Sequence, residues 1–303
     1  MPQFVGKSVV KVLLGLVFII SAVLKLLEID HFELYIYSFH VFSLNLSYLV
    51  ARAAIIVELV LGIGLIANYL HKLMWWGSVA MLLGYSFILL CAIFIGRTDS
   101  CHCFGDFLQM TPKQSLIKNA VLLALFFIIY EMEEWETPFR WLLLSLSIIV
   151  STTGVFLISP PDNYADYSSE HHLQVELFNE MIDQPPLDKL NLREGKQIVC
   201  FFSSGCEYCE MAAQKISLMQ RHNAFHPGRI SYVFMGSKEG IAKFYKESGS
   251  ARYKTLLFDD MSSLMKVVDG NFPVIVLLQD GEVVREYGFR NMDEDEIREF
   301  MAF

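Results

Sequence analysis

The sequence carries little charge for a chain of 303 residues. Asp, Glu, Lys and Arg make up 19% of it, against about 25% in an average globular domain. The shortage lies in one half, since residues 1–160 hold 19 charged side chains and residues 161–303 hold 38. The composition excludes a disordered chain, a collagen-like chain and a single soluble globule. It indicates a membrane half joined to an aqueous half.

Clusters of basic residues are missing as well. The chain has 24 Lys and Arg against 33 Asp and Glu, and −8 of its net charge of −9 falls in residues 161–303. A nucleic-acid-binding domain needs a basic face that contacts phosphates. The acidic balance therefore argues against nucleic acid as a partner.

Long apolar runs take the place of charge in the first half. Five of them have about the 20 residues that a helix needs to cross a bilayer. The sequence therefore predicts an all-α transmembrane bundle over residues 1–160, with spans at 8–27, 47–68, 73–96, 115–130 and 139–158. The first run resembles a signal peptide but lacks a small-residue cleavage site, so we expect it to stay as an anchor.

The number of spans says more than the distribution of positive charge about which segments share a side of the membrane. Both sides of the bundle carry Lys and Arg, and only Lys7 and Lys11 ahead of the first span favour an N-terminus on the inner side. With five spans, however, the loop after the third span and everything after the fifth share one compartment in either orientation.

Three charged residues fall within these spans. Lys25 and Arg52 lie near span ends, and we expect their side chains to extend to the membrane interface. Glu58 lies deep in the second span, where an unpaired charge is costly. We expect Glu58 to pair with a neighbouring helix, with Lys25 as a candidate, or to belong to a proton or quinone site.

The six cysteines divide by their surroundings. Cys91 and Cys200 lie in apolar runs and are expected to be packing residues, because free cysteine is often buried. The remaining four form two closely spaced pairs in one compartment, Cys101/Cys103 and Cys206/Cys209.

The pair Cys206 and Cys209 lies where a strand is expected to meet a helix. Residues 196–203 are predicted to form a buried strand, and a helix is expected from Cys206 to about Arg221. The first cysteine then lies at the helix N-terminus, where unpaired N–H groups and the helix dipole stabilise a thiolate. The second, one turn later, can attack the mixed disulfide that the first forms with a partner.

Strands and helices alternate through the rest of this half. The expected strands are 230–235, 255–258, 274–278 and 283–287, and the expected helices are 238–247 and 294–301. The last two strands form a hairpin. This order predicts an α/β unit, a mixed sheet with helices on both faces.

Residues 185–303 resemble the thioredoxin-like fold in its membrane-anchored TlpA-like form. The resemblance rests on the segment Phe201–Cys209 and on Phe272-Pro273-Val274 just before a strand. It implies that Pro273 is cis, faces the active-site pair and helps to hold an extended partner segment.

The active-site segment departs from the family pattern at two places. Gly205 replaces the usual Trp, and Glu207-Tyr208 replaces Gly-Pro between the cysteines. The dipeptide between the cysteines tunes the redox poise, so the resemblance does not decide between an oxidant and a reductant. The charge of Glu207 opposes a thiolate at Cys206, whereas the helix N-terminus favours it, and the sequence leaves open which effect is larger. Half of a zinc site is the competing interpretation, but no second pair or His cluster completes its ligands in the aqueous half.

The loop segment Ser100–Gly105 resembles the Cys-x-Cys-Phe-Gly motif of the MauE branch of the DoxX-like membrane family. Gly15–Leu26 and Glu58 are similar to the first and second helices of that family. The resemblance covers roughly residues 5–160 and implies a four-helix core and a membrane redox protein. MauE itself serves methylamine utilisation, in the maturation of a disulfide-rich dehydrogenase subunit, and only the redox role is carried over here.

Two chemistries fit Cys101, His102 and Cys103. A disulfide across one residue closes a strained ring, which is easily reduced and suits disulfide exchange. A fixed disulfide, or a copper or zinc site made by these three residues, is the alternative.

These features predict a chain of several domains. A transmembrane domain at 1–160 is followed by a linker at 161–184 and a thioredoxin-like domain at 185–303. A short amphipathic helix is expected near Glu170–Ile182. We expect the bacterial inner membrane, with several passes and the thioredoxin-like domain on the periplasmic side.

The predicted function is membrane-bound thiol–disulfide exchange. Cys206 exchanges disulfides with envelope proteins that carry cysteines, Cys209 resolves the mixed disulfide, and Cys101 and Cys103 relay the electrons. Two alternatives stay open: a copper-handling or enzyme-maturation factor of the MauE type, and an assembly scaffold without catalysis.

The electron acceptor is expected to lie in the bilayer. No covalent cofactor is expected, and none of the cysteines is predicted on the cytoplasmic side, which favours a membrane quinone as acceptor, as in DsbB-type oxidases. Arg97 and Arg52 are the predicted neighbours of the quinone.

Overall fold

The computed structural model describes residues 2–96, 110–130, 138–162 and 173–302. It divides into two compact units. The first comprises Met1–Phe39 and Leu46–Pro161, and the second comprises His40–Asn45 and Asp162–Phe303.

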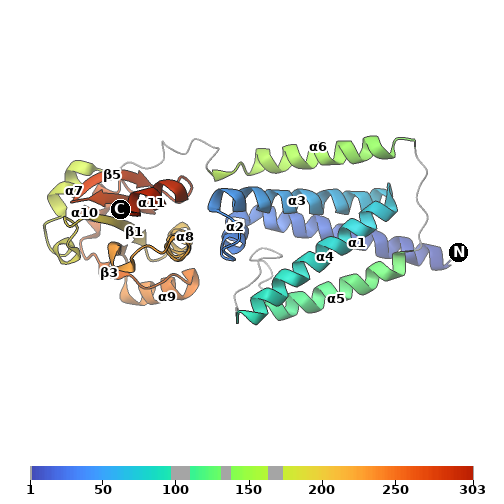
Figure 1. The fold of residues 1–303 in the computed structure, drawn as a ribbon, viewed down its shortest axis with the longest axis horizontal. Helices are drawn as coiled ribbons and strands as arrows, with labels where there is room; N and C mark the ends of the chain where they lie inside the picture. The colour runs from blue at the N-terminus through green and yellow to red at the C-terminus, as the bar shows by residue number, and fades with distance from the viewer. Residues whose placement is uncertain (1, 97–109, 131–137, 163–172, 303) are drawn as a thin grey trace. The chain divides into compact units, whose positions relative to one another are not determined.

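The first unit is a bundle of helices (Figure 1). The helices are α1 (Pro2–Leu27), α2 (Ile29–Tyr37), α3 (Leu44–Ala67), α4 (His71–Phe94), α5 (Pro112–Ile129) and α6 (Arg140–Ile158). Among the described residues, five helices are long and apolar enough to cross a membrane, namely Gly6–Leu27 of α1 and the whole of α3, α4, α5 and α6. The expected spans are confirmed, and each end lies within three residues of its prediction.

The helix α2 was not predicted. Its nine residues are too few to span a bilayer, and its sequence mixes Asp30, His31 and Glu33 with apolar residues. Phe32 and Leu34 are nevertheless buried against the bundle. Tertiary packing of a short amphipathic face therefore forms this helix.

Four helices form the interior of the bundle, as the resemblance to MauE implied. The main cluster of buried apolar side chains comes from α1, α3, α4 and α5. Two glycines let α1 and α3 approach closely, since a Cβ on Gly62 would lie 2.8 Å from the carbonyl oxygen of Gly15. Trp75 Nε1 of α4 donates to the carbonyl of Phe126 in α5 at 2.8 Å. Small residues and interhelical hydrogen bonds of this kind hold helices together in membranes.

Lys25 and Glu58 form an ion pair inside the bundle. Lys25 Nζ lies 2.5 Å from Glu58 Oε1 and also donates to Ser21 Oγ at 2.8 Å. Both side chains are nearly inaccessible. The expected pairing of Glu58 is confirmed. The prediction that Lys25 extends to the interface is wrong, because its side chain runs back along α1 and meets a carboxylate there.

The Arg52 side chain reaches the end of α6, where Ser159 and Pro160 follow the last helical residue, so it extends towards a span end as expected. Its guanidinium is enclosed by protein there, since Arg52 is 1% exposed. Its five N–H groups all have acceptors within the unit. They donate to the Glu33 carboxylate, to the Tyr48 carbonyl, to the carbonyl and hydroxyl of Ser159 and to the Pro160 carbonyl. The guanidinium therefore connects α3 to α2 and to the chain that leaves α6.

The second unit contains a five-stranded mixed sheet. The strands are β1 (Lys196–Ser203), β2 (Ile230–Met235), β3 (Lys254–Leu257), β4 (Val274–Gln279) and β5 (Glu282–Tyr287), in the order β3-β2-β1-β4-β5. β1, β2 and β3 are parallel, whereas β4 is antiparallel to both of its neighbours. The predicted sheet is confirmed, with strand ends within one residue. Asp280 and Gly281 both have positive φ at the β4–β5 turn, which suits a two-residue hairpin.

Helices lie on both faces of this sheet, as predicted. They are α7 (Val175–Met181), α8 (Glu207–Asn223), α9 (Lys238–Ser248), α10 (Met261–Val267) and α11 (Glu294–Met301). On one face, Val199 and Phe201 share a buried cluster with residues of α7 and α10. On the other, Phe202 packs 5.5 Å from Phe244 of α9, and Tyr232 donates to the Ala213 carbonyl of α8. The alternation of side chains along each strand thus fills two cores.

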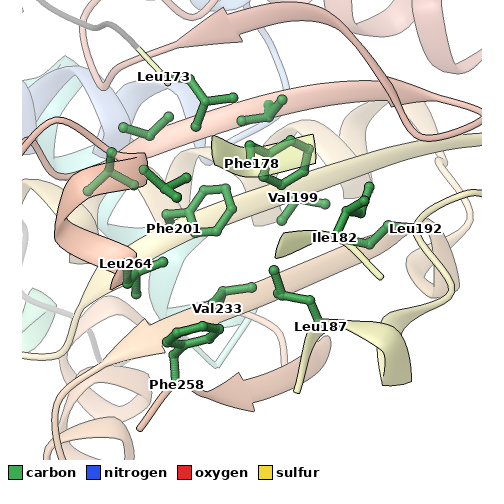
Figure 2. Close-up of a cluster of buried hydrophobic side chains, with 14 of the residues drawn as sticks. Leu173, Phe178, Ile182, Leu187, Leu192, Val199, Phe201, Val233, Phe258 and Leu264 are labelled. Atoms are coloured by element: carbon green, nitrogen blue, oxygen red, sulfur yellow. The ribbon is translucent and has the colours of Figure 1, made fainter. Parts of the chain in front are cut away.

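The helix α7 lies within the stretch expected to be a linker. Phe178 is fully buried and meets Phe201 edge-on at 6.0 Å, and Leu173 and Ile182 join the same cluster (Figure 2). The helix predicted near Glu170–Ile182 is therefore confirmed, and it belongs to the core of the second unit. That core begins at Leu173 and not at residue 185, because α7 supplies apolar cover that the sheet needs.

Removal of Lys25 tests the ion pair in the bundle. Lys25→Met leaves Glu58 uncompensated, and loss of one partner from a buried pair costs about 3–5 kcal/mol. We expect a clearly lower thermal unfolding temperature for the full chain in detergent micelles. The double variant Lys25→Met/Glu58→Leu removes both charges and should recover most of the loss. A double variant as unstable as Lys25→Met would contradict this account.

Candidate functional site

Cys206 and Cys209 lie where β1 passes into α8. The chain turns at Ser204-Gly205, and Cys206 is the N-cap of α8 with φ −102° and ψ 116°. The Cys206 carbonyl accepts the backbone N–H groups of Cys209 and Glu210, both at 3.1 Å. The predicted position of Cys206 at the helix N-terminus is confirmed.

The turn before Cys206 is held by the end of β2. The Ser204 N–H donates to the Met235 carbonyl at 3.0 Å. Gly236 follows with φ +141°, and a Cβ there would collide with the side chain of Ser204. Glycine is therefore required at this close approach, which fixes the loop that presents the cysteines.

The surroundings of Cys206 favour its thiolate. Its Sγ accepts a hydrogen bond from the Cys209 N–H at 3.3 Å. A hydrogen bond from the Cys209 thiol, with the backbone N–H groups of Cys209 and Tyr208, lowers the pKa of Cys206 from 9.0 to about 7. Partial burial and the charge of Glu207 act in the opposite direction. The Cys209 thiol and the backbone N–H groups together thus outweigh Glu207, and the pKa of Cys206 is lowered.

Cys209 has the opposite environment. It is fully inaccessible, and burial, with the neighbouring Cys206, raises its pKa far above the ordinary value. Both residues are free thiols, so the structure represents the reduced pair. Of the two thiols, Cys206 is therefore the one whose environment favours the reactive thiolate, and Cys209 is the one shielded from solvent.

The other two described cysteines lie outside this pair. Cys200 is fully buried in β1, and burial raises its pKa, as expected of a packing residue. Cys91 lies half-buried in the last turn of α4. Neither takes part in the site at Cys206.

Pro273 lies at the same edge of the sheet as the cysteines. The Phe272–Pro273 peptide bond is cis, as the thioredoxin-like resemblance implied. Phe201 pairs with Val274 across β1 and β4, so Pro273 continues this register beside the end of β1. A partner segment laid along Pro273 would therefore run next to the turn that leads to Cys206.

A small aromatic and cationic surface adjoins the pair, and sequence reasoning missed it. Tyr208 is 47% exposed, its ring lies 5.6 Å from that of Phe289, and the Arg290 guanidinium lies 5.8 Å from its centroid. Phe289 and Arg290 follow β5 in a segment without a recognisable motif. The Arg290 guanidinium is ion-paired with the buried carboxylate of Asp162 at 2.9 Å, and Phe289 is buried, so the exposed ring of Tyr208 is what this group offers to a partner.

Glu210 is a second residue that the sequence did not single out. Burial, together with the charge and hydrogen bond of Glu247 in α9, raises the pKa of Glu210 to about 7. Its charge also raises the pKa of the adjacent Cys209. Glu210 is therefore protonated to a larger extent near neutral pH than an exposed glutamate.

The predicted loop site lies outside the described residues. This concerns Cys101, His102, Cys103 and Arg97, so disulfide exchange, metal binding and quinone contact there stay predictions. The prediction of a quinone neighbour at Arg52 also stays a prediction, and the structure shows a use of its N–H groups within the protein.

Comparison with known proteins finds one match to the membrane half and one that covers both halves of the chain. Residues 5–130 match the family model described as methylamine utilisation protein MauE. The resemblance of the membrane half to that family is thereby confirmed. Protein TlpB of Flavobacterium psychrophilum is 25% identical over 293 residues, which cover 80% of this chain and 80% of TlpB. The similarity to TlpB therefore extends over both units.

Several solved structures are similar to part of the chain. A secreted Mycobacterium tuberculosis disulfide oxidoreductase homologous to Escherichia coli DsbE is 14% identical, with a TM-score of 0.30 over 38% of this chain and 84% of that protein. A thiol:disulfide interchange protein from Bacteroides sp. is 18% identical, with a TM-score of 0.30 over 38% and 78%. StoA from Bacillus subtilis is 20% identical, with a TM-score of 0.27 over 35% and 83%.

The architecture of the second unit agrees with the thioredoxin-like prediction, independently of these similarities. It has the mixed sheet, the C-x-x-C pair at a strand-to-helix junction and the cis-proline at the same sheet edge. The second unit therefore has the thioredoxin-like fold that the sequence predicted.

The reactivity of Cys206 should follow its pKa. In the reduced full chain, its alkylation by iodoacetamide should rise with pH through a midpoint near 7, because the thiolate is the reactive form. Cys209 should stay unmodified while the protein is folded. Glu207→Gln removes an opposing charge and should move the midpoint lower. Mass spectrometry of a pH series measures both sites, and a midpoint near 9.0 in the unaltered protein would contradict the assignment.

Proposed function

We propose that this protein is a membrane-bound thiol–disulfide oxidoreductase whose redox-active pair is Cys206 and Cys209. The observation that carries the proposal is a partly exposed thiol of pKa about 7 that caps α8, one turn before a buried thiol. Disulfide exchange needs one accessible nucleophile and one protected resolving group. The five apolar helices and the similarity to TlpB over both units support a membrane-bound form.

The exchange with a client proceeds through a mixed disulfide. In the oxidising direction, a client thiolate attacks Cys206 in the Cys206–Cys209 disulfide, and Cys209 leaves as a thiolate that takes a proton. A second client thiolate then attacks the client sulfur of the mixed disulfide, which forms the client disulfide and releases Cys206. Two electrons have then passed from the client to the pair, and the reverse order of steps would reduce a client.

The loop pair is the proposed next carrier. The Cys206/Cys209 dithiol reduces a Cys101–Cys103 disulfide by the same exchange, and the loop dithiol in turn passes two electrons and two protons to a membrane quinone, which becomes a quinol. With five spans, the segment between α4 and α5 and everything after α6 share one compartment. The parity of the spans therefore supports a relay between the two pairs.

The positions of the cysteines support the oxidising direction of electron flow, from clients to the membrane. A reductase supplied from the cytoplasm needs a cysteine on that side, yet Cys91 lies in the last turn of α4, towards the loop pair. The others belong to the loop or to the second unit. This supports an oxidase in the bacterial inner membrane, with a cytoplasmic N-terminus, a periplasmic second unit and cysteine-containing envelope proteins as clients.

A resolving-site variant tests the relay. Cys209→Ser in the full chain removes the resolving thiol, so Cys206 should accumulate in mixed disulfides in cells. Non-reducing gels with mass spectrometry should identify client adducts and an adduct with Cys101 or Cys103. The matched control Cys200→Ser removes a buried thiol outside the pair and should give no adducts. Client adducts alone would exclude the relay, and a complete absence of adducts would exclude the proposed function.

Quinone depletion tests the direction. During aerobic growth the pair Cys206/Cys209 should be largely oxidised, and in cells that cannot make quinone it should become reduced. Alkylation of free thiols after rapid acid quenching measures the ratio of the two forms. A pair that is mostly reduced in aerobic cells and does not respond to quinone depletion would exclude the oxidase.

A further inference from the structure

Tyr208 places an aromatic ring between the two cysteines of the pair. The side chain is 47% exposed, and the Tyr208 backbone N–H is one of the donors that stabilise the Cys206 thiolate. A client that is joined to Cys206 by a disulfide is attached two residues from Tyr208. The side chains next to the client cysteine are therefore within reach of the Tyr208 ring.

The segment that follows β5 supports one side of this ring. The Phe289 ring lies 5.6 Å from the Tyr208 ring at an interplanar angle of 47°. Phe289 is buried, so the protein interior fixes its position. The Gly288 N–H donates to Asn291 Oδ1 at 2.6 Å, which closes the segment into a turn. Phe289 thus holds the Tyr208 ring and leaves about half of the Tyr208 side chain exposed.

A buried lysine holds Phe289 in this place. Lys215 follows Tyr208 by seven residues in α8, which is two turns, so both side chains lie on one face of the helix. Lys215 Nζ donates to the Phe289 carbonyl at 2.9 Å and lies 4.8 Å from the centroid of the Phe289 ring. One side chain thus fixes both the backbone and the ring of Phe289.

A buried carboxylate balances the charge of this lysine. Asp162 Oδ2 lies 3.8 Å from Lys215 Nζ, and Asp162 Oδ1 lies 2.9 Å from the Arg290 guanidinium. The side chains of Asp162 and Lys215 are each 1% exposed. A well-packed apolar side chain often stabilises a protein as much as a buried ion pair does. Packing alone therefore does not require a lysine at position 215, whereas a fixed position for Phe289 does require a donor there.

The surroundings of the Tyr208 ring favour a neutral aromatic side chain as its partner. Aromatic rings attract each other at centroid distances of about 4.5–7 Å, and Phe289 already makes such a contact. The Arg290 guanidinium lies 5.8 Å from the centroid of the Tyr208 ring, so a second cation beside the ring meets a like charge. The exposed carboxylate of Glu207 attracts a basic side chain, and a basic peptide therefore belongs in the test.

We propose that Tyr208 selects clients with an aromatic side chain next to the reactive cysteine, and that Lys215 is a positioning residue for this selection. The inference rests on the proposed function, because it concerns the client that forms a mixed disulfide with Cys206. Lys215 acts through Phe289, which keeps the Tyr208 ring in one place before the client arrives. A ring that is already fixed loses little conformational freedom on binding.

Peptides activated for disulfide exchange measure the selection. The full chain with Cys209→Ser, in lipid nanodiscs, is mixed with peptides of the form Gly-X-Cys-X-Gly, in which the cysteine forms a disulfide with 5-thio-2-nitrobenzoate and X is Phe, Ala or Lys. The Cys206 thiolate attacks the peptide sulfur, a Cys206–peptide disulfide forms, and coloured 5-thio-2-nitrobenzoate leaves with the electron pair of the broken bond. The absorbance gives the half-saturation constant and the maximum rate. The variant Cys206→Ser/Cys209→Ser gives the background from other thiols.

The ring of Tyr208 should decide the order of the peptides. We expect the phenylalanine peptide to half-saturate the protein at a concentration about 2- to 10-fold lower than the alanine peptide, as one aromatic pair implies. Tyr208→Ala should remove this difference, whereas Tyr208→Phe keeps the ring and should retain it. The matched control Val284→Ala removes a side chain of β5 that is 52% exposed and should leave the ratio unchanged.

Two variants test the positioning role of Lys215. Lys215→Met keeps an unbranched side chain but has no donor for the Phe289 carbonyl, so the ratio of the half-saturation constants should fall towards unity. Lys215→Arg keeps a charged donor and should retain more of the ratio. Phe289→Leu removes the ring that supports Tyr208 without changing a buried charge, and it should lower the ratio as Lys215→Met does. A purely structural role for Lys215 would lower the thermal unfolding temperature and leave the ratio unchanged.

The outcomes separate this inference from the proposed function. A ratio that disappears in Tyr208→Ala and falls in Lys215→Met and Phe289→Leu supports both parts of the inference. Equal constants for the three peptides, a lower constant for the lysine peptide, or a preference that survives Tyr208→Ala overturns the selection by Tyr208. A preference that needs Tyr208 but is unchanged in Lys215→Met and Phe289→Leu overturns the positioning role. If no peptide reacts with Cys209→Ser faster than with the background variant, the proposed function fails.

Discussion

The membrane unit depends on the pairing of charges that its own apolar surroundings cannot solvate. A lysine or carboxylate inside a bilayer has no water to stabilise it, so it must meet a partner on another helix. Lys25 and Glu58 meet in this way between α1 and α3, and Arg52 joins α3 to α2 and to the segment after α6. Because few alternative partners exist in the interior, these contacts restrict how the helices can be arranged.

In the second unit, the surroundings of each thiol decide its protonation. A thiolate is stabilised at Cys206 because the Cys209 thiol and the first N–H groups of α8 donate to it, whereas burial favours the protonated form of the fully enclosed Cys209. The two cysteines are identical in chemistry and differ in exposure and in donors. The sheet supplies the rest, since the register between β1 and β4 brings Pro273 to the edge where β1 ends. The reactivity of Cys206 and the protection of Cys209 thus depend on the first turn of α8. The proposed binding of a partner depends on the end of the sheet where Pro273 lies.

The two units suggest complementary parts of one reaction. Thiol–disulfide exchange moves two electrons between proteins, and it needs an acceptor to continue. We propose a membrane quinone as that acceptor, because quinones move within the membrane and carry two electrons and two protons. The membrane half would then be part of the enzyme and more than an anchor for it.

The sequence by itself determined the features that depend on local patterns. Apolar length located the five spans, alternation and turn residues located β1 to β5, and the position of Cys206 after a strand placed it at a helix N-terminus. Only the tertiary structure decided the features that depend on distant partners. Lys25 looks like an interfacial residue in sequence, but Glu58 draws its side chain into the bundle. Arg52 does reach a span end, but only the fold shows that acceptors in α2 and after α6 enclose its guanidinium. The segment containing α7 looks like a linker, but Phe178 completes the core beneath Phe201. The stability of a buried charge or a short helix comes from residues far away in the chain, and no local pattern records which of them will be close.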